Sequence, residues 1–127
     1  MIVGIGIDIV ELERIAALME RQEHAVQRLL TEAEQKLLAS KRGLSRIEFL
    51  AGRFAAKEAA SKALGTGIGG TVGFLDMEVV TTERGKPEMK IRPHVLQKLE
   101  LDPERTRIHL SISHSRTHAI AQVIVEV

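Results

Sequence analysis

Residues 54–67, FAAKEAASKALGTG, place strong helix formers before a run of glycines and set a short group of charges among them. Alanine, leucine and lysine favour a helix, and Ser45 with Glu48 three residues later is a capping pattern that predicts where the helix begins. Gly65 suits the position after the last turn, because glycine readily adopts the left-handed backbone found there. We therefore expect one long helix over residues 45–64, followed by a glycine-rich loop.

The charges of this helix gather along one edge. Residues three and four apart are neighbours on a helix surface, so Glu58 shares a face with Ser61 and Lys62. Arg53 and Lys57 form the adjoining stripe. Because most other positions are small or apolar, we expect a largely buried helix whose charged edge faces a cleft. The alternative is a solvated Glu58–Lys62 pair, which would stabilise the helix by only about 0.2–0.5 kcal/mol.

A second unusual acid, Asp8, lies in an apolar segment at the N-terminus. Residues 1–10, MIVGIGIDIV, are rich in β-branched side chains and predict a buried strand. Charged groups are rarely buried without a partner or a metal ion. Asp8 also suits a second role, as the cap of the helix that follows. Alternation divides the strand into two faces, which are Gly4, Gly6 and Asp8 on one side and Ile5, Ile7 and Ile9 on the other.

Asp8 and Glu58 together suggest a metal site. Two carboxylates are too few for a dedicated zinc site, but they suit Mg²⁺, which keeps water ligands and is completed by substrate phosphates. Arg53, Lys57 and Lys62 would then neutralise a polyphosphate held by the same ion. This hypothesis accounts for both the acid in the strand and the cations around Glu58.

Two further motifs are weak individually. The triplet GKP at Gly85–Pro87 is common in plain turns. The segment SISHS ends on Ser113, His114 and Ser115, where hydroxyls, an imidazole and backbone N–H groups are available to a phosphate. Polar residues at a hairpin explain the same segment equally well.

Three arginines, Arg14, Arg21 and Arg28, are spaced by seven residues along a predicted helix over 11–29. This spacing places them on one side of the helix, and the apolar residues fall largely on the other. A basic ridge of this kind can steer an acidic protein partner. A solvated helix face is the alternative interpretation.

Composition narrows the class of protein. The chain has 127 residues, 44% of them hydrophobic and 28% charged, which fits a single domain over residues 1–127. A net charge of +1 and only three aromatic residues argue against a nucleic-acid partner. No apolar run approaches the roughly 18 residues that span a bilayer, so we expect no membrane partner. The absence of cysteine fits a cytoplasmic location.

Periodicity predicts an α+β fold, in which three or four main antiparallel strands pack against helices. Strands are expected at residues 1–10, 74–82, 89–91, 106–115 and 118–127. Helices are expected at residues 11–29, 31–38 and 45–64 and near Pro93. Thr31 with Glu34 three residues later is the capping pattern that predicts where the second of these helices begins.

The motifs GIGIDIVE, FAAKEA followed by SKALGTG, GKP and LSISHS occur in this order along nearly the whole chain. This ordered set resembles the holo-acyl-carrier-protein synthases, the small bacterial-type 4′-phosphopantetheinyl transferases. The resemblance implies their fold, with one long central helix. It also implies transfer of 4′-phosphopantetheine from coenzyme A to a serine of an apo acyl carrier protein, with release of adenosine 3′,5′-bisphosphate. Fatty acid biosynthesis is the implied setting, although the sequence does not distinguish this carrier from those of other pathways.

The resemblance also assigns residues. It implies that Asp8 and Glu58 hold Mg²⁺ and that Lys62 lies near the pyrophosphate, so these three residues would be catalytic. Either Glu58 or a water held by an acid would take the serine proton. The resemblance further implies a homotrimer with active sites between subunits, and the acidic carrier would dock on Arg14, Arg21 and Arg28. Coenzyme A binding is expected at Arg53, Lys57, Ser61, Lys62, Gly85, Lys86, Pro87, Ser113 and His114.

Two rival functions remain open from the residues. A Mg²⁺-dependent phosphohydrolase would use the same two acids but would consume coenzyme A without a carrier. A non-enzymatic module would bind acidic partners through the arginines and leave the mass of the carrier unchanged.

Overall fold

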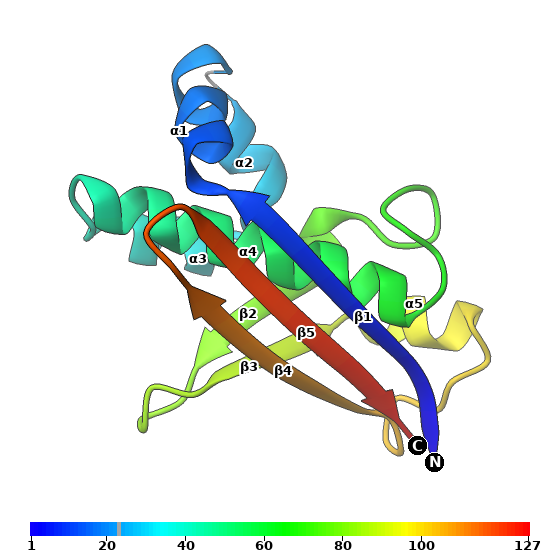
Figure 1. Cartoon of the computed structure of the whole chain (residues 1–127). Coiled ribbons are helices and arrows are strands. Elements are labelled where there is room, and N and C mark those ends of the chain that lie inside the picture. The colour runs from blue at the N-terminus through cyan, green and yellow to red at the C-terminus, as the bar shows by residue number, and fades with distance from the viewer. Residues whose placement is uncertain (23) are drawn as a thin grey trace.

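The strands form two antiparallel sheets in the computed structural model, which describes residues 1–22 and 24–127 (Figure 1). The first sheet has the order β1-β5-β4, formed by β1 (Ile2–Glu11), β5 (His118–Glu126) and β4 (Arg107–His114). The second pairs β2 (Met77–Thr81) with β3 (Pro87–Ile91). The α+β class is therefore confirmed. The strand expected over residues 74–82 instead begins with a short 3₁₀ turn, Phe74–Asp76.

Five α-helices accompany these sheets in the described part of the chain, namely α1 (Leu12–Arg21), α2 (Ala25–Leu29), α3 (Glu32–Ala39), α4 (Leu44–Ala63) and α5 (Pro93–Lys98). The long helix is confirmed, and Gly65 follows it with a φ of +80°. The capping pattern at Ser45 is wrong, because Gly43 occupies the N-cap and the Ser45 hydroxyl donates to the carbonyl of Arg42 instead. The single helix over residues 11–29 is also wrong, since the chain becomes extended at Gln22. Residue 23 of that prediction lies outside the described residues.

Helix α4 lies directly against β1, and two glycines allow this approach. A Cβ atom added at Gly4 would lie 1.9 Å from the carbonyl oxygen of Ala63, and one added at Gly6 would lie 1.9 Å from that of Ala59. Any side chain at these positions would overlap the helix backbone. The glycine face of β1 therefore rests on α4, and the next residue on that face, Asp8, is carried to the same helix.

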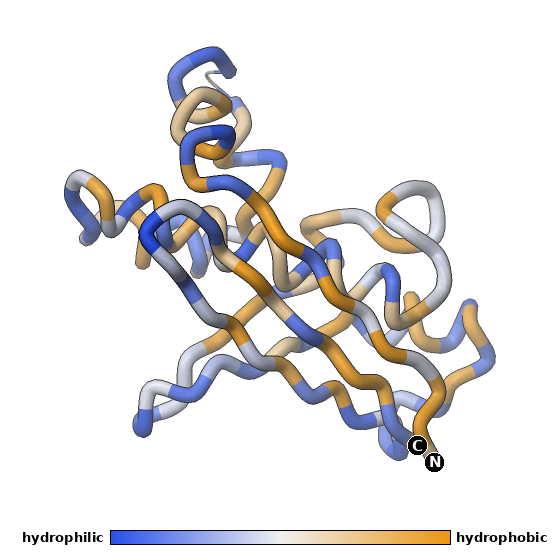
Figure 2. Tube along the Cα trace, viewed as in Figure 1, coloured by the Kyte–Doolittle hydropathy of each residue, from blue (hydrophilic) through white to orange (hydrophobic). Residues whose placement is uncertain are grey.

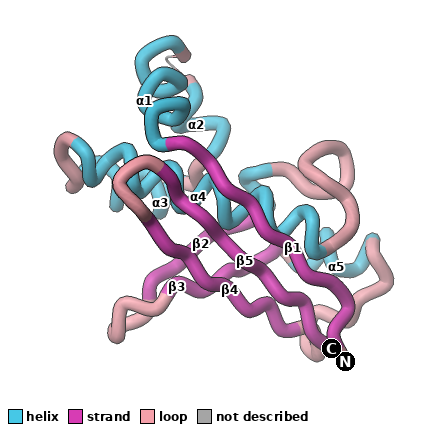
Figure 3. The backbone as a smooth tube through the Cα atoms, in the orientation of Figure 1, coloured by secondary structure: helices cyan, strands magenta, loops and turns pink. Residues whose placement is uncertain are grey.

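The other face of β1 is not covered by this chain. Ile5, Ile7 and Ile9 are 60%, 54% and 62% exposed, so the prediction that this strand is buried is wrong for one of its faces. In Figure 3, α4 and the β2–β3 sheet lie behind the β1-β5-β4 sheet, whose outer face is turned to the viewer. Figure 2 shows hydrophobic residues along both β1 and β5 on this uncovered layer.

No helix in the described residues is both long enough and apolar enough to span a bilayer.

Candidate active site

The second half of β1 and the last turn of α4 bring an acid and a cation together. The Lys62 ammonium donates to Oδ1 of Asp8 at 3.1 Å and to the carbonyl oxygen of Ile7 at 3.0 Å. The Asp8 side chain is only 16% exposed, whereas that of Lys62 is 51% exposed. Asp8 does not cap the following helix, because Glu11 holds that position without a side-chain cap. Asp8 instead points to α4.

Glu58, one turn before Lys62, belongs to the same cluster. Burial raises the pKa of the Glu58 carboxyl, and the negative charge of Asp8 raises it further. Lys62 and Arg14 oppose this shift. The two carboxylates are therefore close enough to repel each other electrostatically, although β1 and α4 are far apart in sequence. The simple surface pair of Glu58 with Lys62 does not describe this arrangement, because the ion pair of Lys62 is with Asp8.

The role expected for Lys57, contact with a phosphate of coenzyme A, is not supported by its position. Its side chain is fully buried, and its ammonium lies 2.6 Å from Oε1 of Glu34 and 2.7 Å from the carbonyl oxygen of Leu29. Burial lowers the pKa of Lys57, and the neighbouring Glu34 carboxylate opposes that shift. An ammonium enclosed in this way is not free to meet a phosphate, so Lys57 does not lie on the charged edge of α4.

The expected contribution of Ser61 to coenzyme A binding is also not supported. Ser61 is fully buried, and its hydroxyl donates to the carbonyl oxygen of Glu58 at 2.7 Å. This is a bond back to the preceding turn of the same helix. The hydroxyl is therefore not available to coenzyme A.

Arg53 and His114, which are far apart in sequence, line one cavity of about 250 Å³ together with Lys41 and Ser45. The Arg53 guanidinium lies 4.0 Å from the centre of the Phe49 ring, and its buried Nε has no hydrogen-bond partner. Nε2 of His114 donates to the carbonyl of Glu48 at 3.2 Å. The lining also includes one acid, Glu48, but two cations, an imidazole and a hydroxyl around one hollow still suit an anionic group such as a phosphate.

The remaining predicted nucleotide residues lie in the β2–β3 hairpin and near the end of β4. Gly85 has a φ of +83° in the β2–β3 hairpin, where it allows the turn. Lys86 and Pro87 line a different cavity of about 300 Å³ beside β4. Ser113 lies near the end of β4. The neighbouring Ser115 accepts the backbone N–H of His118 at 3.0 Å and so shapes the β4–β5 turn. The structure of a single chain does not join these turns to the Asp8–Glu58 cluster.

Arg14, Arg21 and Arg28 all line one cavity of about 500 Å³, which we call the arginine groove. Its apolar lining includes Ile15, Leu18, Leu29, Phe54 and Phe74. The rings of Phe54 and Phe74 stack with their centres 5.7 Å apart. The arginines therefore border an apolar hollow, rather than a purely charged ridge. Phe54 connects this groove to the acid cluster, because it lies one turn before Glu58 on α4.

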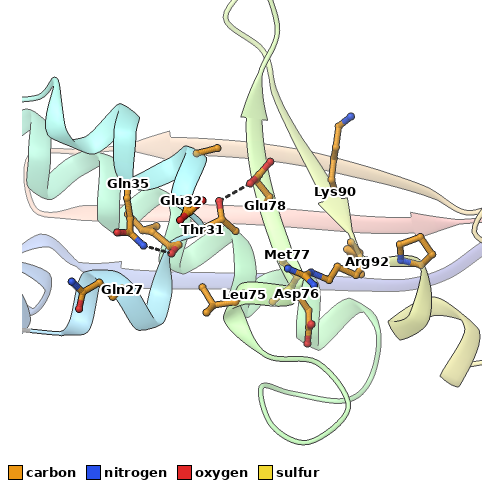
Figure 4. Close-up of a pocket in the computed structure, with 14 residues that line it drawn as sticks. Gln27, Thr31, Glu32, Gln35, Leu75, Asp76, Met77, Glu78, Lys90 and Arg92 are labelled. Atoms are coloured by element: carbon orange, nitrogen blue, oxygen red, sulfur yellow. Dashed lines mark hydrogen bonds between the residues drawn. The ribbon is translucent and has the colours of Figure 1, made fainter.

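A larger cavity of about 800 Å³ lies between the α2–α3 segment and the β2–β3 sheet (Figure 4). Its polar lining mixes acids with bases, including Glu78, Lys90 and Arg92. Within the described residues, it contains none of the predicted site residues. Its size therefore does not identify it as the site of chemistry.

Several residues that shape these sites could not be identified from sequence patterns. Glu34 was visible only as part of the Thr31 capping box, which is confirmed, and nothing in its spacing indicated the bond to Lys57. Phe74 and Lys41 carried no signal of their own. Each of the three meets its partners through tertiary contacts between distant segments, which local periodicity does not report.

Comparison with known proteins gives consistent matches over the whole chain. A profile of the 4′-phosphopantetheinyl transferase superfamily matches residues 4–123. A holo-[acyl-carrier-protein] synthase of Anoxybacillus flavithermus is 54% identical over 129 residues, which cover 99% of this chain and 97% of that protein.

Two solved structures of similar proteins agree with this result. The holo-(acyl-carrier-protein) synthase of Bacillus anthracis, solved in complex with CoA (3′,5′-ADP), is 48% identical with a TM-score of 0.86, and the match covers 99% of this chain and 97% of that one. The enzyme of the same name from Neisseria meningitidis is 37% identical with a TM-score of 0.87 over the full length of both chains. Identity at these levels, together with a shared fold and matching motifs, shows that this chain belongs to the 4′-phosphopantetheinyl transferase superfamily, among the holo-[acyl-carrier-protein] synthases.

Proposed function

We propose that this chain transfers 4′-phosphopantetheine from coenzyme A to a serine of an apo acyl carrier protein, and that residues 1–127 form one catalytic domain for this reaction. The observation that carries the proposal is the convergence of Asp8 from β1 with Glu58 and Lys62 from α4. Relatives that share about half of the sequence are named for this activity, and one was solved with coenzyme A.

Mg²⁺ is the metal that the donor set fits. In the described residues no group of three or more His, Cys, Asp and Glu gathers as a complete metal site. Asp8 and Glu58 supply two hard oxygen ligands, and an ion that retains waters and binds substrate phosphates needs no more from the protein. When bound, Mg²⁺ would lower the negative charge around the pyrophosphate that the serine must approach.

The side chains of the cluster then have separate tasks. Lys62 faces solvent and can contact a phosphate oxygen, which favours departure of adenosine 3′,5′-bisphosphate. The serine oxygen forms a bond to the phosphorus that carries the pantetheine, and the bridging oxygen of the pyrophosphate leaves with the electron pair. The serine proton goes to the Glu58 carboxylate or to a water that it holds. Its raised pKa makes Glu58 a better proton acceptor than an ordinary exposed carboxylate.

We propose that the nucleotide of coenzyme A binds near Arg53 and His114, with a phosphate in the cavity that these residues share with Lys41. The unpartnered Nε of Arg53 supports this assignment, because a buried donor without a partner is costly. Gly85–Pro87 would complete the nucleotide site from the β2–β3 hairpin, and Ser113 would do so from the end of β4. Lys57 and Ser61 are not included, because both are enclosed in the core.

We propose that the acidic carrier docks in the arginine groove. Arg14, Arg21 and Arg28 would meet carboxylates, and the phenylalanines would contact an apolar side chain between them. Replacing Arg21 with glutamate should raise KM for the apo carrier about tenfold or more at low salt and leave KM for coenzyme A unchanged. An unchanged carrier KM would place the docking surface elsewhere.

The uncovered face of β1 supports a homotrimer in which active sites lie between copies. Exposed isoleucines in a row are typical of an interface rather than a free surface. Sedimentation equilibrium tests this, and a monomer at micromolar concentration would reject it. We also place the reaction in the cytoplasm, with no membrane or nucleic-acid partner, and cell fractionation tests that placement.

Mass spectrometry of an apo acyl carrier protein after incubation with the enzyme, Mg²⁺ and coenzyme A is the central experiment. The expected result is a carrier whose mass has increased by one phosphopantetheine, formed only when all components are present. Coenzyme A consumed without carrier would indicate a phosphohydrolase. A carrier that binds but keeps its mass would indicate a docking module.

A further inference from the structure

Lys57 and Glu34 form a charged pair in the core, and Lys57 directly precedes Glu58 in the chain. Both side chains are fully buried, and Nζ and Oε1 lie 2.6 Å apart. A buried ion pair is a poor source of stability, since well-packed hydrophobic residues of the same volume do as well or better. Such a pair instead determines the positions of the neighbouring groups, because its hydrogen bonds hold them at fixed distances and angles.

One of these groups is the end of α2. The Lys57 ammonium also donates to the carbonyl oxygen of Leu29 at 2.7 Å. Leu29 is the last residue of α2, where carbonyls lack partners within the helix and a cation is favourable. Helix α2 has only five residues, too few to be stable alone. The side chains of both Arg28 and Leu29 line the arginine groove.

The other groups belong to the segment that follows α2. Glu34 accepts the backbone N–H of Thr31 at 2.9 Å through Oε1 and that of Val79 on β2 at 2.9 Å through Oε2. The Thr31 hydroxyl donates to Glu78 at 2.5 Å, a bond that Figure 4 shows between α3 and β2. Lys57 and Glu34 thus tie the α2–α3 connection to α4 on one side and to β2 on the other.

We propose that Lys57 and Glu34 are positioning residues for carrier docking: they hold α2, and with it one wall of the arginine groove, at a fixed place relative to Glu58. The inference rests on the proposed function, in which the groove docks the carrier. A carrier serine must arrive within bonding distance of the reacting phosphorus, and a displacement of about 1 Å can lower a rate by two orders of magnitude. The pair controls this distance without touching either substrate.

Two variants test the proposal kinetically. Glu34→Gln keeps the shape of the side chain but removes its charge, and Lys57→Met/Glu34→Gln leaves no unpaired charge in the core. We expect kcat/KM for the apo carrier to fall about tenfold or more in both variants, while KM for coenzyme A changes less than about twofold. The proposal would be overturned if KM for coenzyme A rose by as large a factor as kcat/KM for the carrier fell. It would also be overturned if kcat/KM for the carrier did not fall in the double variant.

A matched control separates positioning from general stability. Val95 on α5 is fully buried and does not line the groove, so Val95→Ala weakens the core at a residue outside the groove. At a temperature where all variants are folded, Val95→Ala should keep both kinetic constants of the wild type. A carrier kcat/KM as low in Val95→Ala as in Glu34→Gln would show that the pair acts only through stability.

Hydrogen exchange of the wild-type protein gives a test that needs neither a variant nor a substrate. The amides of Arg28 and Leu30 bond to carbonyls within and just before α2. If the pair holds α2 in place, these amides should exchange as slowly as the amides of α4. Fast exchange through local opening of α2, with α4 still protected, would overturn the proposal even if transfer is observed. If transfer or groove docking fails instead, this exchange result still stands by itself.

Discussion

The two lysines of α4 show how differently one helix can use the same residue type. Lys57 is enclosed with Glu34 and has no exposed surface, whereas Lys62, little more than one turn later, is half exposed beside Asp8. Each ammonium is held by one carboxylate and one backbone carbonyl from a distant segment, so burial rather than the kind of partner distinguishes the two lysines. The comparison teaches that the charged residues of this helix divide into a set enclosed in the fold and a set at its surface, to which we assign the chemistry and which we call the chemical set.

The largest effect should follow from altering the chemical set at Glu58. Glu58→Gln removes a proposed metal ligand and proton acceptor while keeping the shape of the side chain, so we expect at least about a hundredfold loss of phosphopantetheine transfer. The melting temperature should remain near that of the wild type, because Glu58 is partly exposed. Mass spectrometry of the carrier and thermal unfolding measure the two quantities. Wild-type transfer by this variant would refute the role of Glu58.

The comparison is sharpest when the same substitution is made at both lysines. Lys57→Met leaves Glu34 buried without a counter-charge and should lower the free energy of unfolding by about 3–5 kcal/mol. Lys62→Met removes a half-exposed ion pair and should lower it by no more than about 1 kcal/mol, yet it should impair transfer. Urea unfolding gives both values. Equal losses of stability would mean that the distinction between the two lysines is false.

A smaller effect is expected where β1 meets α4. Gly6→Ala places a methyl group against the Ala59 carbonyl, and such overpacking should cost about 1–3 kcal/mol. Transfer should also fall, because β1 carries Asp8 away from Glu58 as it moves. Gly70→Ala is the matched control, since a Cβ at Gly70 meets nothing within 4 Å. If both variants behave alike in unfolding and transfer assays, the close contact has no role in the site.

The smallest effect is a pH dependence of stability from Glu58. Its folded-state pKa is raised above the ordinary 4.5, so the folded protein binds this proton more tightly than the unfolded chain does. The stabilisation is complete below the ordinary pKa and is lost as pH rises through the raised value. As pH rises over this range, the melting temperature of Glu58→Gln should therefore increase relative to that of the wild type. A difference that is constant with pH would contradict the raised pKa.

Sequence patterns were sufficient for the elements that depend on local signals. The long helix, its glycine end and the Thr31 capping box follow from residue types at fixed spacing, and all are found in the structure. The proximity of Asp8 and Glu58 was expected because an acid in an apolar strand needs a partner. Their roles in metal binding and transfer stay predictions.

Patterns failed where the answer depended on which neighbour covers a face. Helical spacing placed Lys57 beside Arg53 but did not reveal that Glu34 and Leu29 enclose it. Alternation in β1 separated glycines from isoleucines, and the whole strand was predicted to be buried because it is apolar, whereas its isoleucine face is exposed. The glycine side is the inner one, since only a strand without side chains fits so close to α4.

The direct contact of Gly4 and Gly6 with α4 has a consequence for how the chain can diverge. No side chain lies between the two backbones at these points, so the spacing of the acids is determined by main-chain atoms alone. Core residues elsewhere are free to exchange one hydrophobic type for another over generations without shifting that spacing. Substitutions in the rest of the core therefore need not change the distance between Asp8 and Glu58.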